Sequence, residues 1–213
     1  GKPIIGTEKT VSAITREAIL DYMKTLYTPE RIVVSAAGNL EHSQLVRLAE
    51  KTLGDMTGTA PKRILKPAKA SGKSKKLSKR DTEQVHFCLG TNGYNKQENE
   101  RFALSILNNV LGGNMSSRLF QEIREKRGLA YSIGSYTRVY LDTGHFCVYG
   151  GTSPQTYQQV LDLTLAEFEN VRKNGLTEDE LSKAKTQIRG ALVLGLEGMN
   201  SRMSRYADSL LAF

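Results

Sequence analysis

The stretch LGGNMSSRLFQEIREKRGLAYSIGSY, residues 111–136, decides how this chain of 213 residues folds. Its paired glycines at 112–113 are typical of a helix end, and the residues that follow predict a short helix from about 117 to 126. The glycine at 128 marks a turn, after which an apolar run predicts a strand from about 130 to 140. A helix followed at once by a turn and a strand indicates helices packed on a sheet.

The pattern of apolar residues on both sides of this stretch predicts an α+β fold. Before it, apolar and polar residues alternate as in a half-buried strand, and residues 102–111 carry an apolar stripe with helical spacing. After it, residues 144–150 form a second strand that a short turn joins to the first as a hairpin. Three helices follow, and the second begins with a capping box made by Thr177 and Glu180. We therefore expect a mainly antiparallel sheet with helices on one face.

Composition divides the chain into three parts. Residues 1–56 predict a helix capped by Thr15, a short buried strand at 31–39 and a second helix. This is too little for an independent domain, so we expect the end of a longer N-terminal one. Residues 57–81 are rich in Gly, Pro, Ser and Lys and predict an exposed linker. Residues 82–213 then form a second domain, which we expect to be truncated at its end.

The net charge of +8 belongs to the predicted linker. Nine basic residues and no acidic one lie between Pro61 and Arg80, and subtracting these nine from 30 basic residues leaves 21 against 22 acidic residues. The linker is either a docking strip for an acidic partner or a solvated spacer, and its lack of aromatic residues that would stack on bases favours the spacer. We therefore expect no nucleic-acid partner, and a basic nucleic-acid binder stays only as a third alternative.

Neither a membrane span nor a disulfide framework is expected. No apolar run reaches the roughly 18 residues that cross a bilayer, and the chain starts at Gly1 without a leader, as a piece of a longer protein would. The two cysteines, Cys88 and Cys147, fall in predicted strands, where we expect both to be buried, reduced thiols. Reduced thiols suit a reducing compartment, so we expect a cytoplasmic protein without a membrane partner.

The chain lacks the sequence patterns of a hydrolytic metal site. Catalytic zinc needs about three protein ligands, yet His42, His86 and His145 are far apart in sequence and none has a second histidine at helical spacing. Glu41 precedes His42, but Gly38 stands where an H-x-x-E-H motif needs its first histidine. No G-x-S-x-G sequence is present either, so the chain offers no serine nucleophile of that kind. We predict no metal ligands in this chain.

One pair of residues in the opening stretch can carry chemistry. Arg124 is expected near the end of a helix and Tyr131 at the start of the next strand, so the turn between them can bring a guanidinium and a phenol together. Such a pair could hold a peptide carbonyl or stabilise the oxyanion that forms when water attacks it. From the residues alone an ordinary structural role is favoured, because arginine complements a helix C-terminus and tyrosine is common at a strand start.

The chain resembles the insulinase and pitrilysin type of zinc peptidase, which carries an H-x-x-E-H motif. The resemblance is carried by the opening stretch, by PIIGTEKTVSAITREAILDYMKTLYTPERIVVSAAGNLEH at 3–42 and by LSKAKTQIRGALVLGLEGMNSRMSRYADSLLAF at 181–213. It covers nearly the whole chain except the linker. It is strongest for the bacterial relatives of the mitochondrial processing peptidase beta subunit, which implies a bacterial source.

This resemblance implies two homologous domains that enclose a chamber in which peptides are hydrolysed. The N-terminal domain of such enzymes holds zinc through the motif and a later glutamate, and all of those residues would precede Gly1. The C-terminal domain contributes an R-x(6)-Y pair, which Arg124 and Tyr131 match, so the resemblance assigns both to carbonyl binding and transition-state stabilisation. The chain alone is expected to bind no zinc and to be inactive. Its expected partners are a peptide substrate and a zinc-bearing domain or subunit, with homodimer or heterodimer left open.

The same resemblance leaves a second hypothesis open. Some members of the family lack the metal motif yet bind peptides or complement a catalytic partner. The chain would then be a non-catalytic homologous subunit. Its intact R-x(6)-Y pair favours participation in catalysis.

Overall fold

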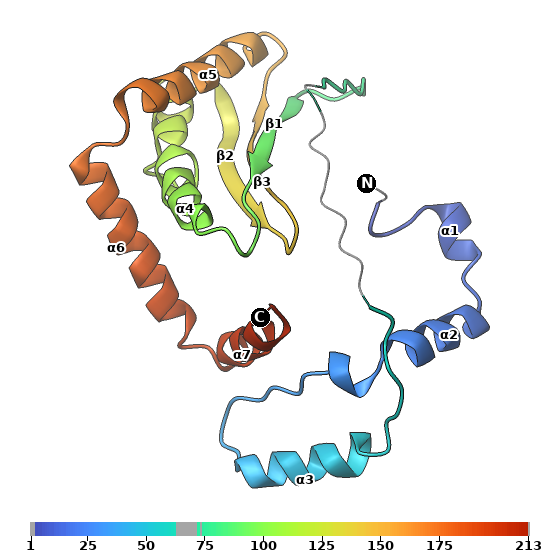
Figure 1. The fold of residues 1–213 in the computed structure, drawn as a ribbon. Coiled ribbons are helices and arrows are strands. Elements are labelled where there is room, and N and C mark those ends of the chain that lie inside the picture. Colours follow the sequence, from blue (N-terminus) through green and yellow to red (C-terminus); the bar gives the residue numbers. More distant parts are fainter. Residues whose placement is uncertain (1–2, 63–71, 73, 213) are drawn as a thin grey trace. The chain divides into compact units, whose positions relative to one another are not determined.

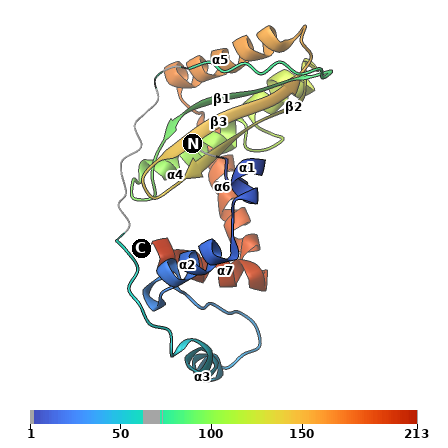
Figure 2. The same cartoon turned by 90° about the vertical axis from the view of Figure 1, so that its right-hand side faces the viewer.

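A three-stranded antiparallel sheet organises the unit formed by residues 65–194. The computed structural model describes residues 3–62, 72 and 74–212 (Figure 1). The strands lie side by side in the order β1-β3-β2 (Figure 2), with bounds β1 (Val85–Gly93), β2 (Ala130–Val139) and β3 (Gly144–Thr152). The predicted hairpin is confirmed, since β2 pairs antiparallel with β3. The α+β class with an antiparallel sheet and helices is confirmed as well.

Helices α4 (Glu100–Leu111) and α5 (Tyr157–Asn174) cover one face of this sheet. Alternate strand residues point toward them, as period-2 alternation requires. Those of the core on β2 and β3 are almost fully buried, whereas those of β1 are half-buried. Full burial of an aliphatic side chain stabilises a fold by about 1.5–3 kcal/mol, so this layer is the main source of stability in the unit. The core consists of Leu111, Leu119, Ile123, Ala130, Ile133, Phe146, Val148 and Val160.

The predicted helix at 117–126 contains a π-helix over Phe120–Glu125. The wider spacing shows in the bond from the Lys126 amide to the Gln121 carbonyl, which is 2.9 Å long. A 3.0 Å bond from the Leu129 amide to the Ile123 carbonyl then closes the turn after the helix. Gly128 follows with φ +60°, a left-handed conformation that glycine adopts at little cost. The chain thereby leaves the helix and enters β2 within a few residues.

The end of α5 and the start of α6 (Glu178–Gly195) agree with the sequence prediction. Gly175 ends α5 with φ +72°. The predicted capping box is confirmed, because the Thr177 amide donates to Glu180 Oε2 at 2.8 Å and the Glu180 amide donates to Thr177 Oγ1 at 3.2 Å. These caps satisfy backbone amides that a helix N-terminus leaves without partners.

Residues 1–64 and 195–213 form a second unit, in which the described regular secondary structure is helical. Its helices are α1 (Glu8–Ser12), α2 (Arg16–Leu26), α3 (His42–Leu53) and α7 (Met199–Ala212), with a 3₁₀ turn at Pro29–Arg31. The Thr15 side chain caps α2 by accepting from the Ala18 amide at 3.2 Å, as predicted. Helices α1, α2 and α3 contain no buried residue, so the described residues of this unit do not form a core comparable to that of the sheet.

The strand predicted at 31–39 is wrong for the part of the chain that the structure describes. Residues 32–37 form neither helix nor ladder, although Ile32 has an extended backbone. An extended segment becomes a strand only when a neighbouring segment pairs with its amide and carbonyl groups. No described residue supplies such a ladder here.

The predicted domain boundaries stay a prediction. The structure places the final helix α7 in the unit with residues 1–64, whereas the sequence assigned all of 82–213 to one domain. Much of the predicted linker, residues 63–71 and 73, lies outside the described residues. Within the described ranges, none of the helices is long and apolar enough to cross a membrane.

Candidate functional site

The structure brings Arg124 and Tyr131 together at the junction of the π-helix and β2. The Arg124 guanidinium carbon lies 5.9 Å from the centroid of the Tyr131 ring and 4.7 Å from that of Phe120. Both separations are within the range of attractive cation–π contacts, so the rings favour the charged side chain in this place. The catalytic and substrate-binding roles assigned to the pair stay a prediction.

Tyr131 is presented by an irregularity in the sheet. Ala130 lies opposite Thr152 and Ser132 lies opposite Gly151, so β2 advances two residues where β3 advances one. Tyr131 is therefore the extra residue of a β-bulge. Bulges redirect a side chain and are frequent beside active sites. The Tyr131 side chain is 77% exposed, while its neighbour Ala130 is buried in the core.

Arg124 lies in the π-helix, a similarly irregular segment that is anchored in the core. Ile123, the preceding residue, is completely buried and anchors the π-helix in the core. π-helical turns are rare and occur often at functional sites. Here the bulge and the π-helix lie on the two sides of the Gly128 turn, so both candidate side chains project from backbone that departs from regular geometry.

The other cations near Arg124 are already paired. Lys126 forms an ion pair with Glu122, and Arg127 reaches the other carboxylate oxygen of Glu122 at 2.5 Å. Lys126 and then Arg127 lower the pKa of Glu122 below its usual range. Among the residues that the structure describes, no carboxylate lies within ion-pair distance of Arg124, so its charge is available to a ligand.

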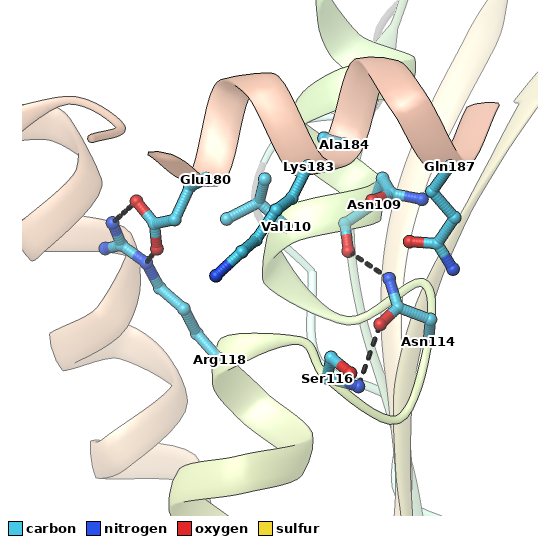
Figure 3. Close-up of a pocket in the computed structure, with 9 residues that line it drawn as sticks. All are labelled: Asn109, Val110, Asn114, Ser116, Arg118, Glu180, Lys183, Ala184 and Gln187. Atoms are coloured by element: carbon cyan, nitrogen blue, oxygen red, sulfur yellow. Dashed lines mark hydrogen bonds and ion pairs between the residues drawn. The ribbon is translucent and has the colours of Figure 1, made fainter. Parts of the chain in front are cut away.

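A partly buried ion pair lies at the start of the segment that leads into the π-helix (Figure 3). Arg118 holds Glu180 with two bonds, Nε to Oε1 at 2.6 Å and Nη2 to Oε2 at 2.7 Å, and its Nη1 lies 3.6 Å from Glu167. The Arg118 guanidinium lowers the pKa of Glu180 to about 2. A small pocket of about 90 Å³ lies next to the pair. Because Arg118 and Glu180 satisfy each other, they clamp α6 to the segment that leads into the π-helix.

Zinc does not fit the described residues of this chain. No three side chains of His, Cys, Asp or Glu in the described ranges are placed to hold a metal ion. The histidines belong to different elements, His42 to α3, His86 to β1 and His145 to β3. Structural and catalytic zinc both need about three or four converging protein ligands.

The outward face of the sheet carries a polar cluster that the sequence reasoning missed. Tyr136 lies 5.8 Å from His145 and 6.0 Å from Tyr149, measured between ring centroids. The strand register places all three on the face opposite the core. The signal was present, since the alternation that predicted the strands also assigns these residues to one face.

The two cysteines differ in environment, which corrects the prediction that both are buried. Cys147 is buried with 5% exposure, whereas Cys88 is exposed. Both cysteines lie on the outward face of the sheet. The difference follows from the strand order, because Cys147 is on β3, between the other two described strands, whereas Cys88 is on the outer strand β1. Burial raises the pKa of the Cys147 thiol.

Comparison with known proteins supplies the context of this site. Residues 13–188 match the family model described as the peptidase M16 inactive domain. The chain is 41% identical over 221 residues to an uncharacterized zinc protease of Streptomyces coelicolor, which covers 100% of this chain and 48% of that protein. It is 41% identical over 206 residues to the uncharacterized zinc protease YmxG of Bacillus subtilis, covering 96% of this chain and 50% of that protein. The chain thus spans about half the length of these bacterial relatives.

Solved structures share the fold. A protease from Helicobacter pylori superposes with a TM-score of 0.84, over 98% of this chain and 52% of that one. At 22% identity, this match shows a shared fold alone. A peptidase M16 inactive domain from Pseudomonas fluorescens superposes with a TM-score of 0.73 at 25% identity over 97% of this chain and 52% of that one. These matches confirm the predicted resemblance to zinc peptidases of the insulinase and pitrilysin type. The chain belongs to the peptidase M16 family.

Proposed function

We propose that this chain supplies the substrate side of a zinc peptidase active site, with Arg124 and Tyr131 as the groups that contact the peptide. The observation that carries the proposal is their convergence, with the guanidinium carbon 5.9 Å from the phenol ring. Membership of the peptidase M16 family supports it. The relatives are named zinc proteases, and we propose the same activity for the protein to which this chain belongs.

The chemistry of the pair fits a peptide carbonyl. Arg124 offers several N–H donors and a fixed positive charge, and Tyr131 offers one O–H donor. Attack of water on a peptide bond places negative charge on the carbonyl oxygen, and donors that are already in place stabilise that charge without reorganising. In this chain the charge of Arg124 is free of carboxylate partners among the described residues, and Tyr131 is 77% exposed.

The metal and the general base belong elsewhere in this proposal. The described residues do not form a zinc site, and the chain spans about half the length of its relatives. We therefore place the zinc-binding residues in another part of a longer polypeptide or in a partner subunit. The chain by itself is expected to hydrolyse no peptide, and activity requires the two halves together.

The organisation of the parent protein is part of the same proposal. Residues 1–56 would complete the zinc-bearing domain, 57–81 would connect the domains and 82–213 would belong to the second domain. We further propose that the parent protein encloses a chamber that takes a peptide substrate. It would assemble as a homodimer or heterodimer and be located in the cytoplasm. None of these requires a nucleic-acid or membrane partner.

The test uses the assembled enzyme, either the longer polypeptide or this chain with its zinc-bearing partner. Changing Arg124→Ala or Tyr131→Phe should lower turnover by roughly ten to a thousandfold with zinc content unchanged, as expected for loss of an oxyanion donor. Arg172→Ala and Tyr140→Phe are matched controls because both side chains are exposed and lie outside the pair. Normal turnover in both site variants would refute the assignment.

A second candidate is a non-catalytic subunit that binds peptides or complements a zinc-bearing partner. It is favoured by one observation, that the matched family model is described as the inactive domain. This candidate predicts that the assembled protein binds peptides without cleaving them, even when supplied with zinc. Hydrolysis that is lost in the Arg124 and Tyr131 variants but kept in the controls would exclude it.

A further inference from the structure

The two thiols of the chain lie near each other on the outward face of the sheet. In the antiparallel ladder Cys88 of β1 is opposite Tyr149, and Cys147 of β3 is opposite Gly90. Residues directly opposite share a face, and so do residues two apart on one strand. Cys88 and Cys147 are therefore diagonal neighbours on one face, on strands that are bonded to each other.

The space between the thiols is open. Gly90 contributes no side chain opposite Cys147, and a Cβ added there would meet only the Phe146 carbonyl oxygen, at 3.7 Å. Both cysteines line one hollow of about 740 Å³ together with Tyr136 and His145. Sites of this size admit small organic molecules. A low-molecular-weight thiol or disulfide can therefore reach the pair.

The environments of the two sulfurs are unequal in a way that suits a stepwise reaction. Cys88 is exposed, whereas Cys147 is 5% exposed and donates its thiol hydrogen to the Val148 carbonyl at 3.4 Å. Burial raises the pKa of the Cys147 thiol, and the neighbouring Cys88 thiol raises it further. An incoming disulfide meets Cys88 first, with Cys147 close behind it.

We propose that Cys88 and Cys147 form a redox-active dithiol that reacts with small-molecule disulfides of the glutathione type. The Cys88 thiolate attacks one sulfur of oxidised glutathione, which forms a mixed disulfide and releases one glutathione thiolate. The Cys147 thiolate then attacks the Cys88 sulfur, which forms the Cys88–Cys147 bond and releases the second glutathione thiolate. The two protein protons pass to the released thiolates, so the dithiol is oxidised as one oxidised glutathione is reduced to two thiols.

The bond should be reversible rather than a permanent staple. Diagonal residues of an antiparallel pair have Cα atoms about 7–8 Å apart, whereas disulfides usually join Cα atoms about 4.4–6.8 Å apart. Because β1 and β3 are already hydrogen-bonded, closing the bond requires the backbone of one strand to shift along the other, which leaves strain in the oxidised form. Strained disulfides are the ones that cellular thiols reduce readily. This inference does not rest on the proposed peptidase function, because its readout is the state of the thiols.

The experiment incubates the full 213-residue chain with glutathione redox buffers, traps free thiols with iodoacetamide and maps disulfides by mass spectrometry. Native wild-type chain should give an intramolecular Cys88–Cys147 bond. Its effective concentration against glutathione should be at least roughly tenfold lower than in 6 M guanidinium chloride, because strain in the folded sheet favours the two reduced thiols. Formation of the bond at equal levels in folded and unfolded chain would overturn the proposal.

Two variants separate the steps. Cys147→Ala should accumulate a stable mixed disulfide of Cys88 with glutathione, because no second thiol resolves it. Cys88→Ala should leave Cys147 unmodified under native conditions. If the wild type also stops at the mixed disulfide, or forms a disulfide only with a second copy of the chain, Cys88 and Cys147 are not a redox-active pair. The wild-type disulfide map decides the question even if removing the buried Cys147 side chain weakens the fold.

Discussion

The ion pair between Arg118 and Glu180 offers a quantitative test of how the candidate site is supported. The change Glu180→Gln keeps the size of the side chain and removes its charge. Arg118 then loses its two short bonds to a carboxylate, 2.6 and 2.7 Å long, while Glu167 remains at 3.6 Å. The helix α6 should be held less firmly against the segment that leads into the π-helix.

The expected loss follows from the pKa of Glu180. Arg118 is the main cause that lowers this pKa from 4.5 to about 2. The difference corresponds to about 3 kcal/mol, and screening by water at a side chain that is 26% exposed reduces the expected loss to about 1–2 kcal/mol. Because the folded pKa is lowered, this stabilisation is fully present above pH 4.5 and disappears as the pH falls from 4.5 to 2.

Urea unfolding of the full chain, followed by circular dichroism, measures the free energy of unfolding at several pH values. The difference between wild type and Glu180→Gln should be about 1–2 kcal/mol at pH 7 and should shrink below pH 4.5. Glu178→Gln is a matched control in the same first turn of α6, and it should cost only the helix-dipole contribution of about 0.3–1 kcal/mol. Equal losses in the two variants, or a difference that is independent of pH, would refute the role of the ion pair.

Three further predictions concern the turn, the core and the metal. Gly128→Ala should destabilise the chain by about 1–2 kcal/mol in urea unfolding because φ is +60°, whereas Gly190→Ala inside α6, where an added Cβ meets nothing within 4 Å, should stabilise it by about 0.5–1 kcal/mol. Ile123→Ala should cost about 2–5 kcal/mol because the side chain is completely buried, and the exposed Leu165→Ala change should cost far less. Metal analysis of the isolated chain should find no stoichiometric zinc, and zinc bound through His42, His86 or His145 would contradict the predicted absence of a metal site.

Local patterns in the sequence predicted much of the unit that holds the candidate site. The alternation at 85–89 located β1, and the Thr177 capping box located the start of α6, because both depend on residues that are close together in the chain. The alternation assigns Cys88 and Cys147 to the same outward face, but only the strand order β1-β3-β2 decides that Cys147 is buried and Cys88 is exposed. The strand predicted at 31–39 is wrong in the described structure because the sequence specifies an extended segment without specifying its neighbour.

The sequence by itself determined the α+β class and the hairpin, since turn residues and apolar period are local properties. It also selected Arg124 and Tyr131 as candidates, through the resemblance of their R-x(6)-Y spacing to that of the family. Only the tertiary structure decided how these two side chains are presented. The bulge at Tyr131 arises from its register with β3, and the π-helix accommodates the burial of Ile123 in the core. The pairing of Arg118 with Glu180, 62 residues away, and the diagonal approach of Cys88 to Cys147 likewise depend on distant segments being packed together, which no local pattern contains.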